Sequence, residues 1–348
     1  MKLKFLFKWL NLESSNMAID LGTSNTLIYT KSDGIVLDEN SMVAYNKKTG
    51  ALITAGKEVL KMIGRTPEDI IISRPLEDGV IADFKMVESM LRFFIEKVQK
   101  KKIFIRPKVL VAVPSGITPV EKKAVVNALE EAGAREVLLI AEPIAGALGM
   151  NLPVEEPTGH MIVDIGGGTT EVAVIALSGI VNKVSIKIAG DELNEAIQTY
   201  LYNEYNMAIG MALAEEIKKR IGSAIPVEEK EEMEMEISGL DLVDGLPKSV
   251  KIKTNEVYEA MKDTLGLIKN AVKKALSETP PELASDIVEK GIFLTGGGAL
   301  LRNIDKMFKE ETDLKVTIAE DPLKSVVKGA GKALDNIKEY KNLLMEPA

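Results

Sequence analysis

The sequence predicts an α/β protein built from two similar halves. Helical and strand periodicities alternate along its 348 residues, which is typical of sheets covered by helices. A second observation is a repeated layout at 17–30 and 161–176, where an apolar strand ends in Asp-x-Gly, passes through small residues and returns as another strand. The two copies lie 144 positions apart, so we expect a duplicated architecture.

The remaining elements follow from local pattern. Apolar residues at helical spacing predict helices at 85–99, 119–132, 191–204, 254–277, 298–309 and 322–340. Short apolar runs predict buried strands at 108–113, 136–140, 180–188 and 291–295. The acidic stretch 228–236 and the turn signals at 244–247 lie between helices and indicate a small inserted subdomain, in which we expect the acidic stretch to be a solvated loop.

Composition narrows the class of protein. At 46% hydrophobic residues the chain can bury a sizeable core, in two domains or in one domain with a deep duplication. No apolar run reaches the ~18 residues that a membrane-spanning helix needs. The absence of cysteine excludes disulfides and thiolate chemistry and fits a reducing cytosol. A net charge of −8 argues against a general nucleic-acid binder.

The first ten residues, MKLKFLFKWL, interleave lysines with large apolar side chains. In a helix Lys4 and Lys8 would share one face while apolar residues cover much of the rest, as in an interfacial membrane anchor. The segment is too short for a secretory signal, Lys8 interrupts it, and no small-residue cleavage site follows. The alternative is that it packs on a neighbouring subunit.

The first hairpin turns through DLGTSNT at 20–26. Gly22 would let the backbone approach an anion, and exposed amides together with Thr23, Ser24 and Asn25 could donate hydrogen bonds to phosphate oxygens. An ordinary turn uses the same residues, so this motif alone leaves both interpretations open.

Two further segments carry glycine runs. DIGGGTTE at 164–171 places three glycines inside an apolar hairpin, which is hard to explain unless a ligand comes close to the main chain. GIFLTGGGALLRN at 291–303 runs from a strand through glycines into a helical pattern, a corner suited to an anion or nucleotide. Neither segment is a Walker A loop or a G-x-G-x-x-G dinucleotide fingerprint.

Three acidic residues are candidates for chemistry. Asp20 and Asp164 would face each other if the hairpins meet across a cleft, where two carboxylates can hold a hydrated Mg²⁺ against nucleotide phosphates. Glu142 begins a predicted helix after a strand, with Pro143 in its first turn. On the sequence pattern alone Glu142 is either a water-orienting group or a plain helix-start residue.

Serine–histidine catalysis is not expected. The only histidine, His160, follows a turn and has no histidine or cysteine partner, which favours a structural role. Ser115 lies in VPSG, which lacks the G-x-S-x-G elbow and is interpreted as a turn.

The three glycine-bearing segments, in this order, resemble the superfamily of actin, heat-shock chaperone ATPases and sugar kinases. Over roughly 17–335 the sequence resembles the MreB family of bacterial actin-like filament proteins almost position for position. The segments that carry this resemblance are RPLEDGVIADF at 74–84, VPSGIT at 113–118, EAGAREV at 131–137, EPTGHMIVDIGGGTTEVAVI at 156–175, DGLPKSV at 244–250, TPPELASDI at 279–287 and LTGGGALLRNID at 294–305.

The resemblance implies an actin-like ATPase fold, with duplicated ribonuclease-H-like cores in two lobes and four subdomains around a nucleotide cleft. The implied boundaries are 1–16 for the membrane segment, 17–43, 77–156 and 326–348 for the first core, 44–76 for its insertion, 157–192 and 257–325 for the second core, and 193–256 for the second insertion.

The resemblance also implies a site for ATP or ADP with Mg²⁺. Its phosphate loops would be Asp20 with Gly22, Thr23, Ser24 and Asn25, and Asp164 with Gly166, Gly167, Gly168 and Thr169. Ribose and adenine contacts would come from Gly190, Asp191, Glu215, Glu216, Ile217, Lys218, Gly297, Gly298, Ala299 and Leu300. Glu142 would orient the attacking water with help from Thr169, while Asp20 and Asp164 hold the metal through water.

The resemblance implies ATP-dependent polymerisation into filaments of paired protofilaments, coupled to slow ATP hydrolysis and to bacterial cell shape. Such filaments lie in the cytoplasm on the inner face of the cell membrane, here through residues 1–10 and Ile103, Phe104 and Ile105, unless 103–105 belong to a strand edge. Two positions depart from the family: Ala141 replaces the first of two glutamates, and Ser24 stands where alanine is usual. Because Glu142 remains, hydrolysis should survive.

Two other classes share this fold. A sugar kinase would need a sugar pocket with a dedicated catalytic aspartate, and the resemblance throughout the insertions speaks against it. A chaperone ATPase would carry a separate peptide-binding domain after the nucleotide core, for which we expect this chain to end too soon.

Overall fold

The computed structural model describes residues 16–99 and 106–345, so the two expected membrane elements at 1–10 and 103–105 lie outside the described residues. The chain divides into two compact units. The first contains Met1–Pro157, Ile175–Ile180 and Leu323–Ala348, and the second contains Thr158–Val174 and Val181–Pro322. Within the described ranges no helix is long and apolar enough to cross a membrane.

The first unit is built on a six-stranded sheet with the order β19-β10-β9-β1-β2-β3. Its strands are β1 (Met17–Leu21), β2 (Asn25–Thr30), β3 (Gly34–Asn40), β9 (Lys108–Val113), β10 (Glu136–Ala141) and β19 (Leu344–Met345). β1, β9 and β10 are parallel, whereas β2 and β3 continue from β1 as antiparallel neighbours. β9 reads KVLVAV and is buried from its second residue onward, as a strand covered on both faces must be.

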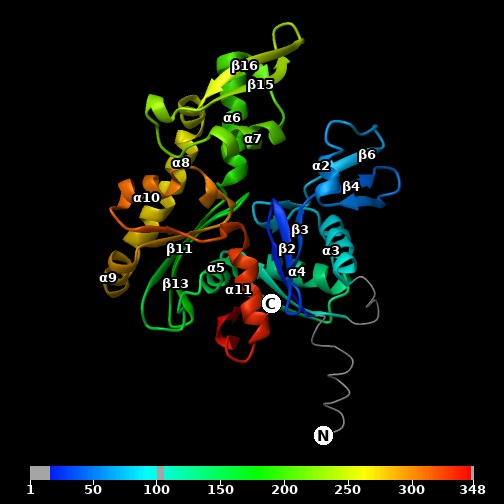
Figure 1. Ribbon diagram of the computed structural model, residues 1–348. Coiled ribbons are helices and arrows are strands. Elements are labelled where there is room, and N and C mark those ends of the chain that lie inside the picture. Colours follow the sequence, from blue (N-terminus) through cyan, green and yellow to red (C-terminus); the bar gives the residue numbers. More distant parts are fainter. Residues whose placement is uncertain (1–15, 100–105, 346–348) are drawn as a thin grey trace. The chain divides into compact units, whose positions relative to one another are not determined.

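Helices cover both faces of this sheet. α3 (Phe84–Gln99) and α4 (Pro119–Glu131) lie on one face, and α5 (Glu142–Gly149) and α11 (Ser325–Asp335) lie on the other (Figure 1). The first turn of α4 is fixed by a capping box, in which the Glu121 amide donates to Thr118 Oγ1 and the Thr118 amide donates to Glu121 Oε2. This cap explains why the predicted helix begins at 119.

A small sheet is inserted in the first unit between β3 and α3. It has the order β5-β4-β6, from β4 (Val43–Asn46), β5 (Leu52–Ala55) and β6 (Ile70–Ser73), together with the short helix α2 (Lys57–Leu60). Its own core contains Met42, Ala44 and Val59, separate from the core of the large sheet. The chain then returns through the short hairpin β7 (Leu76–Glu77) and β8 (Val80–Ile81).

The second unit repeats the plan. Its main sheet has the order β13-β12-β11-β17-β18, from β11 (His160–Ile165), β12 (Thr170–Ala176), β13 (Gly179–Ile186), β17 (Ile292–Thr295) and β18 (Val316–Ile318). β11, β17 and β18 are parallel. Strand for strand this order matches β3-β2-β1-β9-β10 of the first unit, which confirms the predicted duplication.

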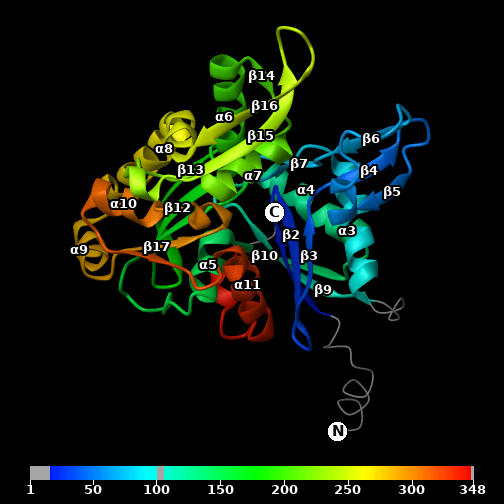
Figure 2. The same ribbon diagram turned by 45° about the horizontal axis from the view of Figure 1, so that its top comes forward.

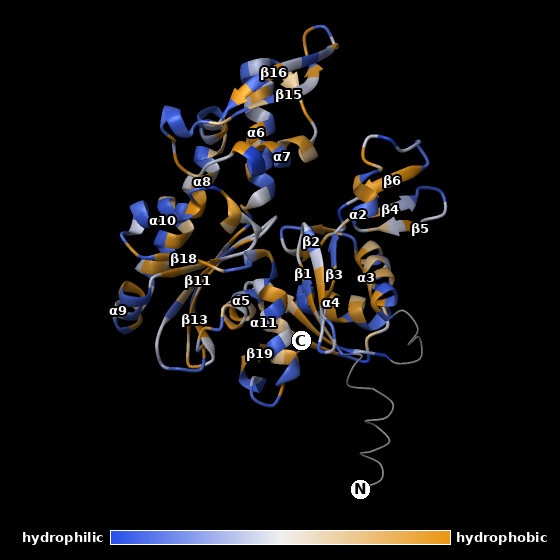
Figure 3. Cartoon of the chain, in the orientation of Figure 1, coloured by the Kyte–Doolittle hydropathy of each residue, from blue (hydrophilic) through white to orange (hydrophobic). Residues whose placement is uncertain are grey.

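The rest of the second unit packs on one continuous core. It comprises α6 (Gly190–Tyr205), α7 (Met211–Ile221), α8 (Thr254–Ser277), α9 (Pro281–Lys290), α10 (Ile304–Thr312), and a small sheet of β14 (Met207–Ala208), β15 (Glu234–Asp241) and β16 (Pro247–Lys253) (Figure 2). The core joins Val163 of β11 to Leu265 of α8 and Ile237 of β15. Hydropathy follows this burial, with apolar strands inside and polar helix faces outside (Figure 3).

Three sequence predictions need correction. The helix expected at 298–309 is two pieces, the 3₁₀ helix η3 (Gly297–Leu300) and α10, because Asn303 adopts a left-handed φ of 62° between them. The helix expected at 322–340 begins with the 3₁₀ turn η4 (Pro322–Lys324) and ends as α11 at Asp335, where Asn336 leaves helical geometry.

The third correction concerns the acidic stretch 228–236. It is a solvated loop only in its first part, which contains the 3₁₀ turn η2 (Glu229–Glu231). β15 begins at Glu234, and Met235 and Ile237 point into the core while Glu234 and Glu236 are exposed. The alternation of acidic and apolar residues is therefore a strand pattern.

The contact between α5 and α11 provides a stability test. A Cβ atom on Gly329 would lie 1.7 Å from the Ala145 carbonyl oxygen, so Gly329→Ala must push the helices apart. We expect the free energy of unfolding to fall by about 1–3 kcal/mol in urea titrations. Gly266→Ala is the matched control because nothing lies within 4 Å of its added methyl group in α8. It should stabilise by roughly 0.5–1 kcal/mol, and equal effects of the two substitutions would contradict this account.

Candidate functional site

The first predicted phosphate loop is the turn between β1 and β2. The Gly22 amide donates to the Asn25 carbonyl over 3.1 Å and closes the turn. A Cβ atom on Gly22 would lie 2.8 Å from that same carbonyl oxygen, so the position requires glycine. Thr23 is buried, and its Oγ1 accepts the Gly79 amide at 3.0 Å. Gly79 was not predicted as a neighbour of the loop.

Asp20 occupies the carboxyl end of β1, directly before this turn. Part of the residue reaches the surface, yet burial raises the pKa of Asp20 to about 7. A carboxyl group with this pKa is poorly solvated as an anion, so an incoming cation would favour its ionised form.

Glu142 lies at the same edge of the sheet. β10 ends at Ala141 and α5 starts at Glu142 with Pro143 in its first turn, as the sequence predicted. In the sheet register Asp20 is level with Ala112 of β9, and Ala112 is level with Ile140 of β10. Glu142 follows β10, which lies two strand spacings from β1, so the backbone at Asp20 is roughly 10 Å from the end of β10.

The second predicted loop has the same construction in the second unit. The Gly166 amide donates to the Thr169 carbonyl at 2.9 Å, the counterpart of the Gly22–Asn25 bond. The carbonyls of Gly166 and Gly167 accept the amides of Gly190 and Asp191 at 3.2 and 2.7 Å. These amides belong to the start of α6, so the helix fixes the loop from behind.

Lys218 of α7 lies beside this arrangement. Its Nζ donates to the Gly190 carbonyl at 2.6 Å. Burial lowers the pKa of Lys218 to about 8, and the nearby carboxylates of Glu215 and Asp191 offset part of that effect. The structure thus brings three predicted segments of the second unit together: the glycine loop, the start of α6 and α7.

The third glycine segment packs against the same strand end. Gly296, with a φ of 82°, leaves no room for a side chain, because a Cβ atom would lie 2.3 Å from Asp164 Oδ1. A Cβ atom on Gly298 would lie 2.2 Å from Ile165 Cγ2. These two glycines hold η3 directly against the end of β11, next to the second loop.

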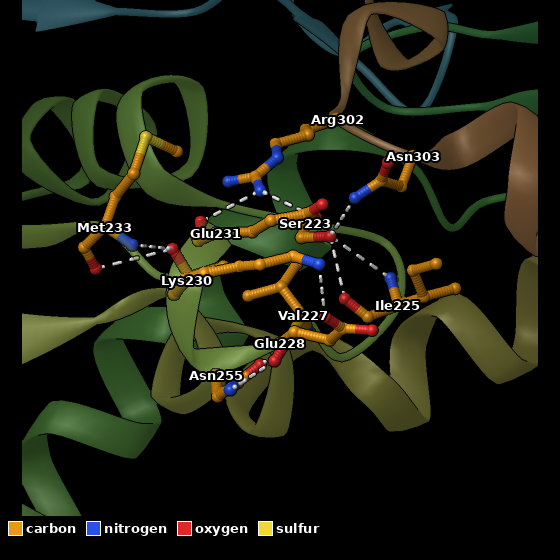
Figure 4. A network of polar contacts seen from close by, with 11 residues as sticks. Ser223, Ile225, Val227, Glu228, Lys230, Glu231, Met233, Asn255, Arg302 and Asn303 are labelled. Carbon is orange, nitrogen blue, oxygen red and sulfur yellow. Dashed lines mark hydrogen bonds and ion pairs between the residues drawn. The ribbon is translucent and has the colours of Figure 1, made fainter.

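A polar network fastens the segment that follows α7 to the segment that follows η3 (Figure 4). Asn303 Nδ2 donates to Ser223 Oγ at 3.0 Å, and the Ala224 amide donates to the Arg302 carbonyl at 2.8 Å. Arg302 also donates to the Glu231 carbonyl at 3.0 Å. The sequence did not single out Ser223 or Asn303, because nothing local indicates that residues 80 positions apart are bonded.

Not every predicted contact residue presents its side chain outward. Ile217 is fully buried in the core of the second unit, and Ala299 is nearly so, so neither side chain is available to a ligand. Glu216 is exposed and pairs with Arg220 one turn along α7. Leu300 is 58% exposed and is the apolar side chain of η3 that a planar base could cover.

The residues expected to be structural fit that role. His160 is buried in β11, with its ring 6.2 Å from that of Phe293. Ser115 lies in a turn that the Ile117 amide closes onto the Pro114 carbonyl.

Comparison with known proteins identifies the relatives of this architecture. The family model described as MreB/Mbl protein matches residues 14–342. The chain belongs to the MreB/Mbl family. The cell shape-determining protein MreB of Escherichia coli K12 is 50% identical over 338 residues, covering 95% of this chain and 96% of that protein. Mbl of Bacillus subtilis 168 is 44% identical over 322 residues, covering 92% and 96%.

Solved structures agree. MreB5 of Spiroplasma citri bound to ADP superposes with a TM-score of 0.88 at 42% identity, covering 93% of this chain and 97% of that one. A second MreB5 structure, bound to AMPPNP, gives the same TM-score. The MamK double helical filament superposes with a TM-score of 0.77 but is only 21% identical, so this likeness supports the fold and nothing more. The predicted actin-like fold is therefore confirmed, and the chain is a cytoskeletal protein of the cell-shape family.

Lys218 allows a test by pH. Its pKa is about 8 in the folded chain against 10.5 for an ordinary lysine. Between these values the unfolded state carries one more proton there, so the free energy of unfolding rises with pH. Relative to Lys218→Met, wild-type stability in urea should climb from about pH 8 to 10.5 and be level below pH 8. Lys309→Met, on the exposed face of α10, is the control for the loss of a surface lysine. A flat difference for Lys218→Met would contradict the buried ammonium.

Proposed function

We propose that this chain binds and slowly hydrolyses ATP with Mg²⁺ while assembling into membrane-associated filaments that determine or maintain bacterial cell shape. One observation carries the proposal: each unit holds an aspartate and a closed glycine turn at the same point of the same strand order, Asp20 with Gly22 and Asp164 with Gly166. The MreB5 structures with ADP and AMPPNP support an adenine nucleotide as the ligand.

The phosphate contacts would be made mainly by backbone amides. In both loops, backbone carbonyls accept hydrogen bonds from a neighbouring segment, so the loop amides remain as donors for an anion. Because these donors belong to the backbone, no side chain must move when negative charge develops on the phosphate oxygens. Gly190, Asp191, Glu215 and Lys218 would bind the ribose side, and η3 with Gly297, Gly298 and Leu300 the base. We propose that the two loops serve one nucleotide per chain, and calorimetric stoichiometry checks this.

The donor set fits Mg²⁺ held through water. Among residues 16–99 and 106–345 no cluster of three or more His, Cys, Asp or Glu could hold a metal by itself. Mg²⁺ usually keeps several waters and takes one or two carboxylates plus phosphate oxygens, which Asp20 and Asp164 can provide. The high pKa of Asp20 fits a carboxyl that awaits a cation. The bound ion would neutralise charge on the phosphates.

Hydrolysis would be an in-line attack of water on the γ-phosphate. Glu142 is proposed to orient that water, with Thr169 assisting. α5 holds Glu142 rigidly because Gly149 and Gly329 let α5 and α11 pack without intervening side chains.

We also propose the four-subdomain division, with insertions at 44–76 and 193–256, which is supported by the small sheets β5-β4-β6 and β14-β15-β16.

The role of Glu142 can be isolated by substitution. Glu142→Ala should slow phosphate release from ATP by about 10²-fold or more while leaving the ATP dissociation constant within about twofold. Phosphate release and equilibrium binding are measured on the same preparation. Glu130→Gln, on the exposed end of α4, is the control and should behave as wild type. Unchanged turnover in Glu142→Ala would remove its assigned role.

The membrane contact is proposed from sequence. Each inserted aromatic or leucine side chain contributes about 1.5–3 kcal/mol, so one subunit would bind modestly and a filament tightly. Deleting residues 1–10 should weaken co-flotation with anionic liposomes. A variant with Lys2, Lys4 and Lys8 replaced by glutamine keeps the apolar side chains but loses the positive charges. Its co-flotation therefore distinguishes electrostatic attraction to anionic lipid from insertion of the apolar side chains. Equal flotation of full-length and truncated chains would exclude residues 1–10 as the anchor.

Filament assembly and kinase activity predict different behaviour. With ATP and Mg²⁺ we expect assemblies that sediment and that electron microscopy shows as filaments. A metabolic kinase of the same fold would stay in the supernatant and phosphorylate a small alcohol.

A further inference from the structure

Ser41 lies directly behind the first phosphate loop. It follows β3 in the chain and is completely buried. Its Oγ donates to the Gly22 carbonyl at 2.6 Å, and its amide donates to the Ser24 carbonyl at 2.9 Å. One residue thus holds two carbonyls of a three-residue turn.

A second hydroxyl sets the direction of the first. Thr26 Oγ1 lies 2.9 Å from Ser41 Oγ, and Thr26 is also completely buried. The single Ser41 hydroxyl hydrogen is used on the Gly22 carbonyl, so Thr26 must be the donor to Ser41. The result is a directed chain from Thr26 through Ser41 to Gly22.

The orientation of the loop follows from peptide geometry. A trans peptide group is planar, so its C=O and the next N–H point in opposite directions. Because the carbonyls of Gly22 and Ser24 point toward Ser41, the amide hydrogens of Thr23 and Asn25 point away from it. These are the donors that an anion in front of the loop would meet.

The second unit supports this interpretation independently. There the carbonyls of Gly166 and Gly167 are held by the amides of Gly190 and Asp191, which also follow the third strand of their sheet. Thr170, the counterpart of Thr26, donates to the Ile188 carbonyl at 2.7 Å in the same region. One unit holds its loop with the start of a helix and the other with a serine.

We propose that Ser41 is the positioning residue of the first phosphate loop, acting through the Gly22 and Ser24 carbonyls to aim the loop amides at the nucleotide phosphates. The proposal rests on the proposed function, because it assumes that the loop binds a nucleotide. Ser41 also precedes β4 by two positions, so the same residue joins the loop to the small inserted sheet.

Substitution of Ser41 separates positioning from folding. Ser41→Ala removes the donor to Gly22 and should raise the dissociation constant for Mg–ATP about tenfold. Adenosine, which has no phosphate, should bind as it does to wild type, measured by displacement of a fluorescent ATP analogue. Thr26→Val should weaken ATP binding in the same direction but less, because it removes only the outer hydroxyl.

Thr30→Val is the matched control. Thr30 is buried at the far end of the same strand, and its Oγ1 has no hydrogen-bond partner among the described residues. Its substitution should leave both dissociation constants unchanged.

The outcomes are distinguishable. A selective loss for ATP in Ser41→Ala and Thr26→Val supports the proposal. Equal losses for ATP and adenosine with a lowered melting temperature, or no loss at all, would overturn it. If Ser41→Ala does not fold, Thr26→Val against Thr30→Val decides alone. Failure of the wild-type chain to bind ATP would instead sink the proposed function.

Discussion

The rigidity of the peptide group is the constraint on which the candidate site depends. A loop that binds phosphate with its amides must have its carbonyls turned away and satisfied elsewhere, because an unsatisfied buried carbonyl is costly. Both units meet this requirement in the same place, at the carboxyl ends of β1 and β11, which come first in the chain among the strands of their main sheets. The third strand exits beside the hairpin turn, so the residues after it can reach the loop carbonyls. The strand order therefore determines which segment can hold the loop.

The two units satisfy this constraint with different chemistry. In the second unit the start of α6 supplies backbone amides, and Lys218 ties the Gly190 carbonyl to α7. Sixteen helical residues stand behind those amides, so this loop is fixed by a long, well-packed element. In the first unit the loop carbonyls of Gly22 and Ser24 are held by the hydroxyl and the amide of Ser41, which lies between β3 and β4. We infer that the first loop is more sensitive to side-chain substitution than the second.

Much of this arrangement could be predicted from the sequence. The two hairpins and the strand–helix junction at Glu142 depend on local signals, and the structure confirms them. The steric reasons for glycine at Gly22 and Gly296, which are close contacts of an added Cβ atom with Asn25 and Asp164, came only from the structure. Ser41 and Asn303 were missed because their partners lie 19 and 80 positions away in the chain. The break at Asn303 was also missed, since a left-handed residue inside an apolar repeat leaves no mark on periodicity. Strand β15 was missed because its glutamates favoured the prediction of a solvated loop, although they alternate with apolar residues as in a strand.

Both small sheets come after the segments that hold the loops. β4 begins two residues after Ser41, and the second small sheet follows α6, whose first residues hold the second loop. In the first unit the small sheet begins directly after Ser41 and Met42, whereas in the second unit it begins after the sixteen-residue helix whose first residues hold the second loop. A displacement of β4 would be transmitted to Ser41 through Met42, the one residue between them, which is packed in the small core and accepts the Gly56 amide at 3.0 Å. The first loop and the small inserted sheet are consequently joined through Ser41, which is hydrogen-bonded to the loop, and Met42.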